Sequence, residues 1–271
     1  MTAPVAGVLL ALASATLHAA WNVRLKASGD PLQLAARALP VATAAATPAV
    51  FVAWLLLGRP PLPVEGIGLA LISGGLELGY FGLLSAAYRR GAISSVYPVA
   101  RGTAPLIAIV VGIGVLGESL TGLQLAGAAA IVLGVWLSRP TGTSRAALLP
   151  AIGTGLFIAA YSTADRIGVR TGPFWLYGWA VFVATSAFLL PWWGKGPVRG
   201  VPAVGALTIS AYSLVLLAFS IAPLALVAPA REAGVVLVAG WGIARLGERE
   251  RPVAKLMGAT SVLVGAALLV I

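Results

Sequence analysis

Long apolar runs separated by short polar connections account for nearly the whole chain. A helix needs about 20 residues to cross ~30 Å of hydrocarbon. The pattern predicts membrane-spanning helices at residues 4–26, 32–57, 64–88, 92–116, 121–138, 146–168, 173–193, 200–220, 223–245 and 253–271. The connections are too short for a soluble domain, so we expect the function to reside within the spans. The first run is too long for a signal-peptide core, so we expect it to be retained.

The composition strengthens this interpretation and excludes several function classes. The chain is 59% hydrophobic and 10% charged, and its mean hydropathy is +0.98, values typical of a bilayer protein. It has no cysteine and one histidine, which excludes disulfides, thiol chemistry and a multi-histidine metal site. We therefore expect no catalytic residues, no metal and no cofactor, and a polytopic membrane enzyme is the less favoured alternative.

The net charge of +10 does not indicate nucleic acid binding, because the cations are spread over short connections and helix ends. Of the eighteen Lys and Arg residues, twelve lie in or beside the odd-numbered connections and three in the even-numbered ones. The positive-inside rule places the odd-numbered connections in the cytoplasm and both termini outside. We expect a multi-pass protein of the cell's inner (cytoplasmic) membrane, with no nucleic acid partner.

A short motif occurs twice, which indicates an internal duplication. The first copy is Pro98-Val-Ala-Arg101 with Leu-Gly-Glu118, and the second is Pro229-Ala-Arg231 with Leu-Gly-Glu248. Each half has five spans, which is an odd number. The second half must therefore cross the membrane in the opposite sense to the first, as in many secondary transporters. We predict an all-α integral membrane fold of ten transmembrane helices in two inverted five-helix repeats: 1–138, a polar linker at 139–146, and 147–271.

Two glycines follow each copy of the motif at the same spacing. Gly127 and Gly134 return 131 positions later as Gly258 and Gly265. With the Leu-Gly-Glu segments, this pattern resembles the EamA family of the drug/metabolite transporter (DMT) superfamily. The resemblance implies a ten-helix secondary transporter of amino acids, drugs, sugars or other metabolites. It also implies cytoplasmic termini, opposite to the charge distribution, so the orientation stays open.

Three side chains of the first span share one helix face. His18, Trp21 and Asn22 are spaced at i, i+3 and i+4. This face either lines a substrate cavity or bonds neighbouring helices, as polar residues do in membrane bundles. His18 is also a candidate proton carrier.

Glu77 lies near the middle of the third span, with Tyr80 three residues further on. An ionisable side chain in hydrocarbon costs roughly 2.5–3.5 kcal/mol on insertion scales, so it needs a partner, water or a function. We interpret Glu77 as a proton-carrying or amine-binding carboxylate and Tyr80 as part of the same site. The structural alternative is a permanent salt bridge to Arg101.

Pro98 and Pro229 lie at matching positions of the fourth and ninth spans. Each removes a backbone hydrogen-bond donor, so we expect both to interrupt their helices and to act as hinges.

Two arginines beside these prolines are candidates for binding an anion. Tyr97 and Arg101 share a helix face, and Arg231 and Glu232 occupy the matching region of the second half. Buried guanidinium groups suit a carboxylate, phosphonate or phosphate on the substrate. The alternative is internal neutralisation, Arg101 by Glu77 and Arg231 by Glu232 or a carbonyl group.

The second half contributes further aromatic candidates. Tyr161 lies 140 positions after Trp21, and Tyr212 lies 131 positions after Phe81. Asp165 follows Tyr161 by one helical turn, and it either gates an opening or belongs to a solvated helix end. Glu118 and Glu248 sit at helix junctions, where we expect each to accept backbone donors at the start of the following helix.

Together these features predict a secondary transporter that works by alternating access around a site near the bilayer midplane. The substrate is a small polar or zwitterionic metabolite, amino-acid-like, an amine or phosphonate-like, with optional proton coupling through Glu77 or His18. The partners are this small molecule and the lipid bilayer, and the protein is a monomer or homodimer. The alternative is a lipid-linked substrate flippase of the same fold, which differs by a lateral opening.

Overall fold

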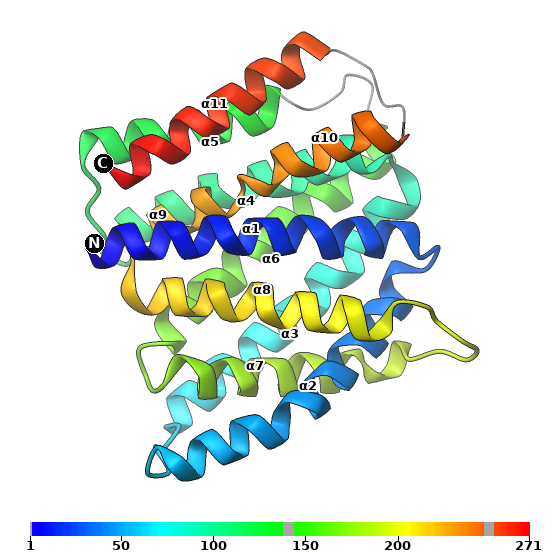
Figure 1. Ribbon diagram of the computed structural model, residues 1–271, viewed down its shortest axis with the longest axis vertical. Helices are drawn as coiled ribbons and strands as arrows, with labels where there is room; N and C mark the ends of the chain where they lie inside the picture. The colour runs from blue at the N-terminus through cyan, green and yellow to red at the C-terminus, as the bar shows by residue number, and fades with distance from the viewer. Residues whose placement is uncertain (1, 138–143, 247–251) are drawn as a thin grey trace.

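A computed structural model describes residues 2–137, 144–246 and 252–271, and the secondary structure within these ranges is helical (Figure 1). The helices are Ala3–Ala27 (α1), Pro31–Leu56 (α2), Val64–Arg90 (α3), Ile93–Gly114 (α4), Gly122–Leu137 (α5), Arg145–Gly168 (α6), Phe174–Leu189 (α7), the 3-10 turn Leu190–Trp192 (η1), Val201–Ile221 (α8), Leu224–Arg231 (α9), Gly234–Leu246 (α10) and Pro252–Val270 (α11). The ten predicted spans coincide with these helices to within a few residues, and the ninth is divided into α9 and α10. Most of the predicted linker, residues 138–143, lies outside the described residues, and α6 begins at Arg145.

Seven of the described helices are long and apolar enough to cross a membrane, namely α1, α2, α3, α4, α6, α7 and α8. Two further apolar helical stretches, Gly122–Leu137 and Met257–Leu269, are shorter. The helices lie side by side, so that their ends define two faces of the molecule (Figure 1). Both termini lie at one face with the α2–α3, α4–α5, α6–α7 and α8–α9 connections. The α1–α2, α3–α4 and α7–α8 connections lie at the other.

Helices α5 and α11 pack closely through paired glycines. A Cβ atom added to Gly127 would lie 2.8 Å from the carbonyl oxygen of Gly265, and one added to Gly134 would lie 2.5 Å from that of Gly258. The later glycine of α5, Gly134, contacts the earlier glycine of α11, Gly258, so the two helices are antiparallel. The absence of side chains lets the backbones approach, as small residues commonly do between membrane helices.

The two motif prolines behave differently from the prediction. Helix α4 continues through Pro98 without a break, although proline there removes the donor for the carbonyl group four residues before it. In the second half the helix breaks after Arg231 rather than at Pro229, which lies inside α9. The amide of Glu232 donates to the Pro229 carbonyl at 2.9 Å, a tighter i to i−3 pattern that often marks a functional hinge.

Candidate functional site

A small enclosed cavity lies among α1, α2, α3, α6, α7 and α8, and many of the predicted site residues surround it. Its volume is about 20 Å³, about the space of one water molecule. Six predicted residues contribute to its wall: His18, Trp21, Glu77, Tyr80, Tyr161 and Tyr212. The cavity is therefore polar and aromatic, but closed to anything larger than water in this conformation.

Aromatic rings form a continuous part of the wall. The rings of Tyr80 and Tyr161 meet edge to face with centroids 5.7 Å apart, and Tyr161 and Tyr212 meet in the same way at 5.8 Å. Phe182 continues this row, with its ring 6.1 Å from that of Tyr212. Such edge-to-face pairs stabilise the closed arrangement and present ring faces that attract cations.

Glu77 is the acid that faces the cavity. Its side chain is buried, and one carboxylate oxygen accepts a hydrogen bond of 2.8 Å from the hydroxyl group of Thr185 on α7. The alternative salt bridge from Glu77 to Arg101 does not form among the described residues, because Arg101 pairs with Glu232 instead. Thr185 was not a sequence candidate, since an isolated threonine in an apolar span carries no recognisable signal.

Asp165 is fully buried, so the prediction of a solvated helix end is wrong. One carboxylate oxygen accepts a hydrogen bond from the Tyr177 hydroxyl at 2.8 Å, and the other accepts one from the Tyr212 hydroxyl. Tyr177 reaches it because it packs on Gly168, where a Cβ atom would collide with the tyrosine ring. Tyr212 also lines the cavity, so a single side chain connects Asp165 to the space that Glu77 faces.

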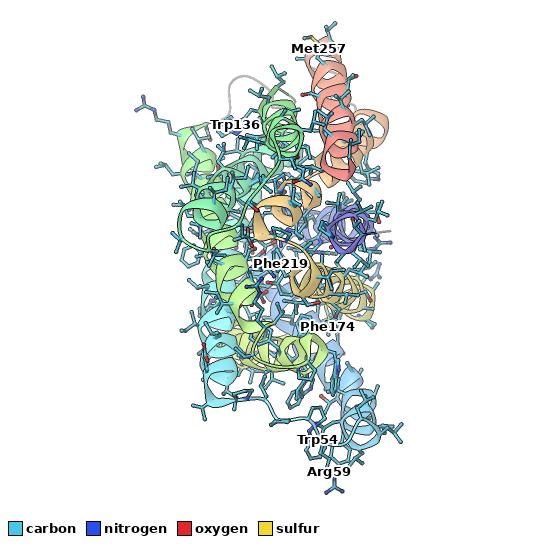
Figure 2. All side chains as sticks on the ribbon, turned by 90° about the vertical axis from the view of Figure 1, so that its left-hand side faces the viewer. Trp54, Arg59, Trp136, Phe174, Phe219 and Met257 are labelled. Carbon is cyan, nitrogen blue, oxygen red and sulfur yellow. The ribbon has the colours of Figure 1, made fainter. Side chains whose placement is uncertain are left out.

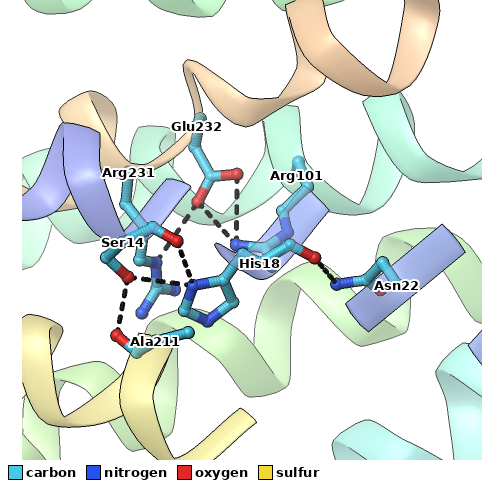
Figure 3. A network of polar contacts seen from close by, with 7 residues as sticks. All are labelled: Ser14, His18, Asn22, Arg101, Ala211, Arg231 and Glu232. Atoms are coloured by element: carbon cyan, nitrogen blue, oxygen red, sulfur yellow. Dashed lines mark hydrogen bonds and ion pairs between the residues drawn. The ribbon is translucent and has the colours of Figure 1, made fainter. Parts of the chain in front are cut away.

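A buried cluster of three charges lies at the break in the ninth span (Figure 3). One guanidinium nitrogen of Arg101 donates to both carboxylate oxygens of Glu232, at 3.4 and 3.5 Å. Arg231 Nε lies 3.6 Å from the same carboxylate. One carboxylate thus pairs with two arginines that are only 3% and 1% exposed, so the cluster keeps an excess of positive charge. The predicted Arg231–Glu232 pairing is present, whereas the predicted partner of Arg101 was wrong.

The arginine cluster lies behind the cavity wall, and the predicted site residues Tyr97, Arg101, Arg231 and Glu232 are not part of that wall. The Tyr97 ring lies 5.2 Å from the Arg101 guanidinium, and the Tyr161 ring lies 6.0 Å from that of Arg231. Within the described part of the chain, Nε and Nη1 of Arg231 and Nε1 of Trp21 have no hydrogen-bond partner. Unsatisfied buried donors of this kind are uncommon and need an explanation. A ligand with acceptor oxygens would satisfy them.

The two polar residues of α1 have different surroundings. His18 lines the cavity, and its Nδ1 lies 3.0 Å from the Ser14 hydroxyl oxygen. Asn22 does not line it: its amide donates to the His18 carbonyl at 2.9 Å and accepts from the Tyr88 hydroxyl at 2.8 Å. Asn22 therefore bonds neighbouring helices, as the structural alternative predicted.

Glu118 closes the face of the bundle that carries the termini. Its carboxylate accepts hydrogen bonds from the backbone amides of Leu224 and Ala225 at 2.8 and 2.9 Å, and it forms an ion pair of 2.9 Å with Arg166. The prediction that Glu118 accepts donors at a helix start is confirmed, but the helix is α9 rather than the following helix, α5. Glu248 lies outside the described residues.

These features define a multi-pass helical membrane protein with a small, charged and enclosed central cavity. Residues 5–139 match the EamA-like transporter family, and the chain belongs to this family of the DMT superfamily. The fold is similar to that of a protein of known crystal structure, with a TM-score of 0.69. The two sequences are 21% identical, and the match covers 98% of this chain and 94% of the other. Among curated proteins, none matches the sequence significantly.

Proposed function

We propose that this protein is a secondary transporter that moves a small polar or zwitterionic metabolite across the cytoplasmic membrane by alternating access. The observation that carries the proposal is the enclosed cavity with Glu77 in its wall and the arginine cluster behind His18 and Tyr161. An enclosed site with ionisable groups in the middle of a membrane bundle is costly unless it serves a ligand. The closed cavity corresponds to an occluded conformation.

Helix contacts support an arrangement of two inverted repeats. Counterparts in the two halves are α1 and α6, α2 and α7, and α3 and α8. Helix α1 packs on α8, and α6 packs on α3; exchanging counterparts converts the first contact into the second. The α2–α7 contact maps onto itself, as does the antiparallel α5–α11 pair. A two-fold axis that relates the halves would account for all of these contacts, and it is the arrangement of many transporters in which one half rocks against the other.

Cation contacts at the two ends of the bundle follow the same symmetry. Lys26 at the end of α1 donates to the carbonyl of Tyr88 at the end of α3, and Arg166 at the end of α6 donates to the carbonyl of Phe219 at the end of α8. Arg166 follows Lys26 by 140 positions, and Phe219 follows Tyr88 by 131, the offsets that relate the two halves of the sequence. We infer that these two contacts break alternately: one when the bundle opens on one side of the membrane, and the other when it opens on the opposite side.

The charges around the cavity favour a substrate with both an amine and an acid group. Glu77 faces an ammonium group, while the excess positive charge of Arg101 and Arg231 faces a carboxylate or phosphonate. Three buried carboxyl groups, Glu77, Asp165 and Glu232, stand against these two arginines. One proton on a carboxyl group balances the set, so proton coupling through Glu77 is part of the proposal, with His18 as a second carrier.

The test begins with a search for a ligand. Purified protein is screened by thermal unfolding against amino acids, amines, phosphonates and nucleosides. A compound that raises the Tm is radiolabelled and used for counterflow in proteoliposomes. Absence of counterflow with every stabilising compound would contradict the transport function.

The coupling role is tested with two variants of α3. We expect Glu77→Gln to slow proton-driven uptake about tenfold, a barrier change of ~1.4 kcal/mol or more, and to abolish its response to a pH gradient. The matched control is Glu65→Gln, because Glu65 is exposed in the first turn of the same helix. Equal uptake in the two variants would remove Glu77 from the coupling step without excluding transport.

A further inference from the structure

Three cavities adjoin one another through shared wall residues, from the centre of the bundle to the outer side of α2. The innermost is the central cavity of about 20 Å³, with Leu39 and Phe182 in its wall. The second is a cavity of about 210 Å³ among α2, α7 and α8, with Phe182 again in its wall. The third is a groove of about 900 Å³ among α2, α3 and α7, which shares Val50 and Trp179 with the second. Phe182 alone is common to the walls of the two inner cavities.

The apolar wall of the outermost groove suits the bilayer rather than water. Its wall is mostly aliphatic and aromatic, and Phe51 and Leu71, which line it, are 56% and 51% exposed. At its end the Arg59 guanidinium lies 5.8 Å from the Trp54 ring, and Figure 2 places both residues at the far edge of the molecule. An apolar channel in the hydrocarbon region with a cation at its rim matches the charge and polarity of an amphiphile with an acidic head group.

Few polar contacts hold α2 against α7 along this path. Pro40 and Pro48 lie inside it and each removes a backbone hydrogen bond. The hydrogen bonds that the structure gives between α2 and α7 along the cavities are those of Thr43 with Ser186, at 3.2 Å, and of Trp179 with Thr47, at 3.0 Å. Separating the two helices therefore breaks few polar contacts.

Phe182 lies in the wall between the central cavity and the second cavity. It lies in α7 one turn after Gly178, which also lines the second cavity. A helical side chain leans over the turn before it, and Gly178 itself has no side chain there. Part of that space is taken by Leu216, whose Cδ1 would lie 2.7 Å from a Cβ added to Gly178, so the Phe182 ring can turn that way only if Leu216 shifts with it. Rotation of the Phe182 ring toward the second cavity would join it to the central one.

We propose that Phe182 is a lateral gate, and that the path beneath α2 admits the hydrocarbon segment of an amphiphilic substrate from the bilayer to the central site. A wholly hydrophilic solute would lose its hydrogen bonds to water along the apolar groove, at a cost of several kcal/mol. A hydrocarbon chain loses nothing on leaving the bilayer for this groove. The charged head of the amphiphile reaches Glu77 and the arginine cluster while its tail stays beneath α2. The assignment of the substrate rests on the proposed transport function, and it narrows the polar or zwitterionic substrate to one whose charged head carries a hydrocarbon segment.

The path itself is tested by cysteine labelling, because the natural chain has no cysteine. Ser213→Cys places a thiol in the second cavity. Leu133→Cys is the lipid-exposed control on α5, and Ala151→Cys is the buried control, since Leu133 is 61% exposed and Ala151 is fully buried. In liposomes we expect a lipophilic maleimide to label Ser213→Cys at a rate within about tenfold of Leu133→Cys. A charged methanethiosulfonate should label it no faster than Ala151→Cys. Two results overturn the lateral path: labelling of Ser213→Cys by the charged reagent as fast as by the lipophilic maleimide, or no labelling of Ser213→Cys by either reagent.

The gate is tested with a reporter in the central cavity. Thr208→Cys lines that cavity, and we expect adding Phe182→Ala to raise its labelling by the lipophilic maleimide about tenfold. The matched control is Phe188→Ala, also on α7 but 39% exposed and outside the cavity walls described above, and it should leave the rate unchanged. Equal rates in both double variants overturn the gate.

Labelling needs no substrate turnover, so its outcome is independent of the counterflow assay. Labelling as expected without counterflow leaves the path in place and removes the transport function. Counterflow without labelling of Ser213→Cys by the lipophilic maleimide supports the transport function and removes the lateral path.

Discussion

The buried Arg101–Glu232–Arg231 cluster makes a sharp prediction about stability. Glu232→Gln removes the carboxylate that neutralises both arginines while keeping the shape of the side chain. At 3.4 and 3.6 Å, an effective dielectric constant near 20 gives about 5 kcal/mol of attraction for each contact. Most of this offsets the desolvation of the charges, so removing one partner of such a buried pair costs about 3–5 kcal/mol.

The same geometry predicts an order among variants. Arg101→Leu leaves one arginine, Arg231, opposite one carboxylate, so the remaining charges balance and the loss should be smaller than for Glu232→Gln. For a chain of this size, about 3–5 kcal/mol corresponds to a fall in Tm on the order of 10 °C. Thermal unfolding in detergent, followed by tryptophan fluorescence, measures both variants beside the wild type.

One result would refute this reasoning. If Arg101→Leu lowers the Tm as much as Glu232→Gln does, a balanced Arg231–Glu232 pair is no more stable than two arginines without a carboxylate, and Glu232 does not serve both arginines. A Tm change below about 2 °C for Glu232→Gln, less than ~1 kcal/mol, would mean that water or lipid compensates the cluster.

Two further predictions concern helix contacts. Gly127→Leu should destabilise the protein by several kcal/mol, because its Cβ alone would lie 2.8 Å from the Gly265 carbonyl; Gly122→Leu on the same helix meets nothing within 4 Å and should leave the Tm unchanged, and equal Tm values would contradict the close α5–α11 contact. Glu118→Gln should weaken the contact with Arg166 and the α9 amides and raise amide hydrogen exchange at the start of α9 by roughly tenfold, ~1.4 kcal/mol. Unchanged exchange there would show that the carboxylate charge does not hold α9.

The spans and the site residues differed in how far the sequence could predict them. Hydropathy placed the ends of the helices within a few residues, because crossing hydrocarbon requires a long apolar segment whatever the neighbours are. It did not predict that α4 runs straight through Pro98 while the ninth span breaks after Arg231. Proline is the sixth residue of both α4 and α9, so the loss of its donor does not by itself decide where a helix ends.

The polar residues show the same division. The free-energy cost of placing a charged side chain in hydrocarbon identified Glu77, Arg101 and Arg231 as candidate site residues from the sequence, since each needs a partner or a function. The choice of partner lay beyond the sequence, because Glu77 and Glu232 were both available to Arg101. Asp165 was placed at a solvated helix end because it lies near the end of a span, whereas Tyr177 and Tyr212 cover it completely.

The sequence by itself determined that this is a helical membrane protein with a duplicated motif, because hydropathy and internal repetition are properties of the chain alone. Only the tertiary structure decided which polar residues face a common cavity, which carboxylate pairs with the arginines, and that Phe182 lies in the walls of both this cavity and the cavity among α2, α7 and α8. The physical reason is that burial and pairing depend on side chains brought together from different helices. No local pattern along one helix records which neighbour it will meet.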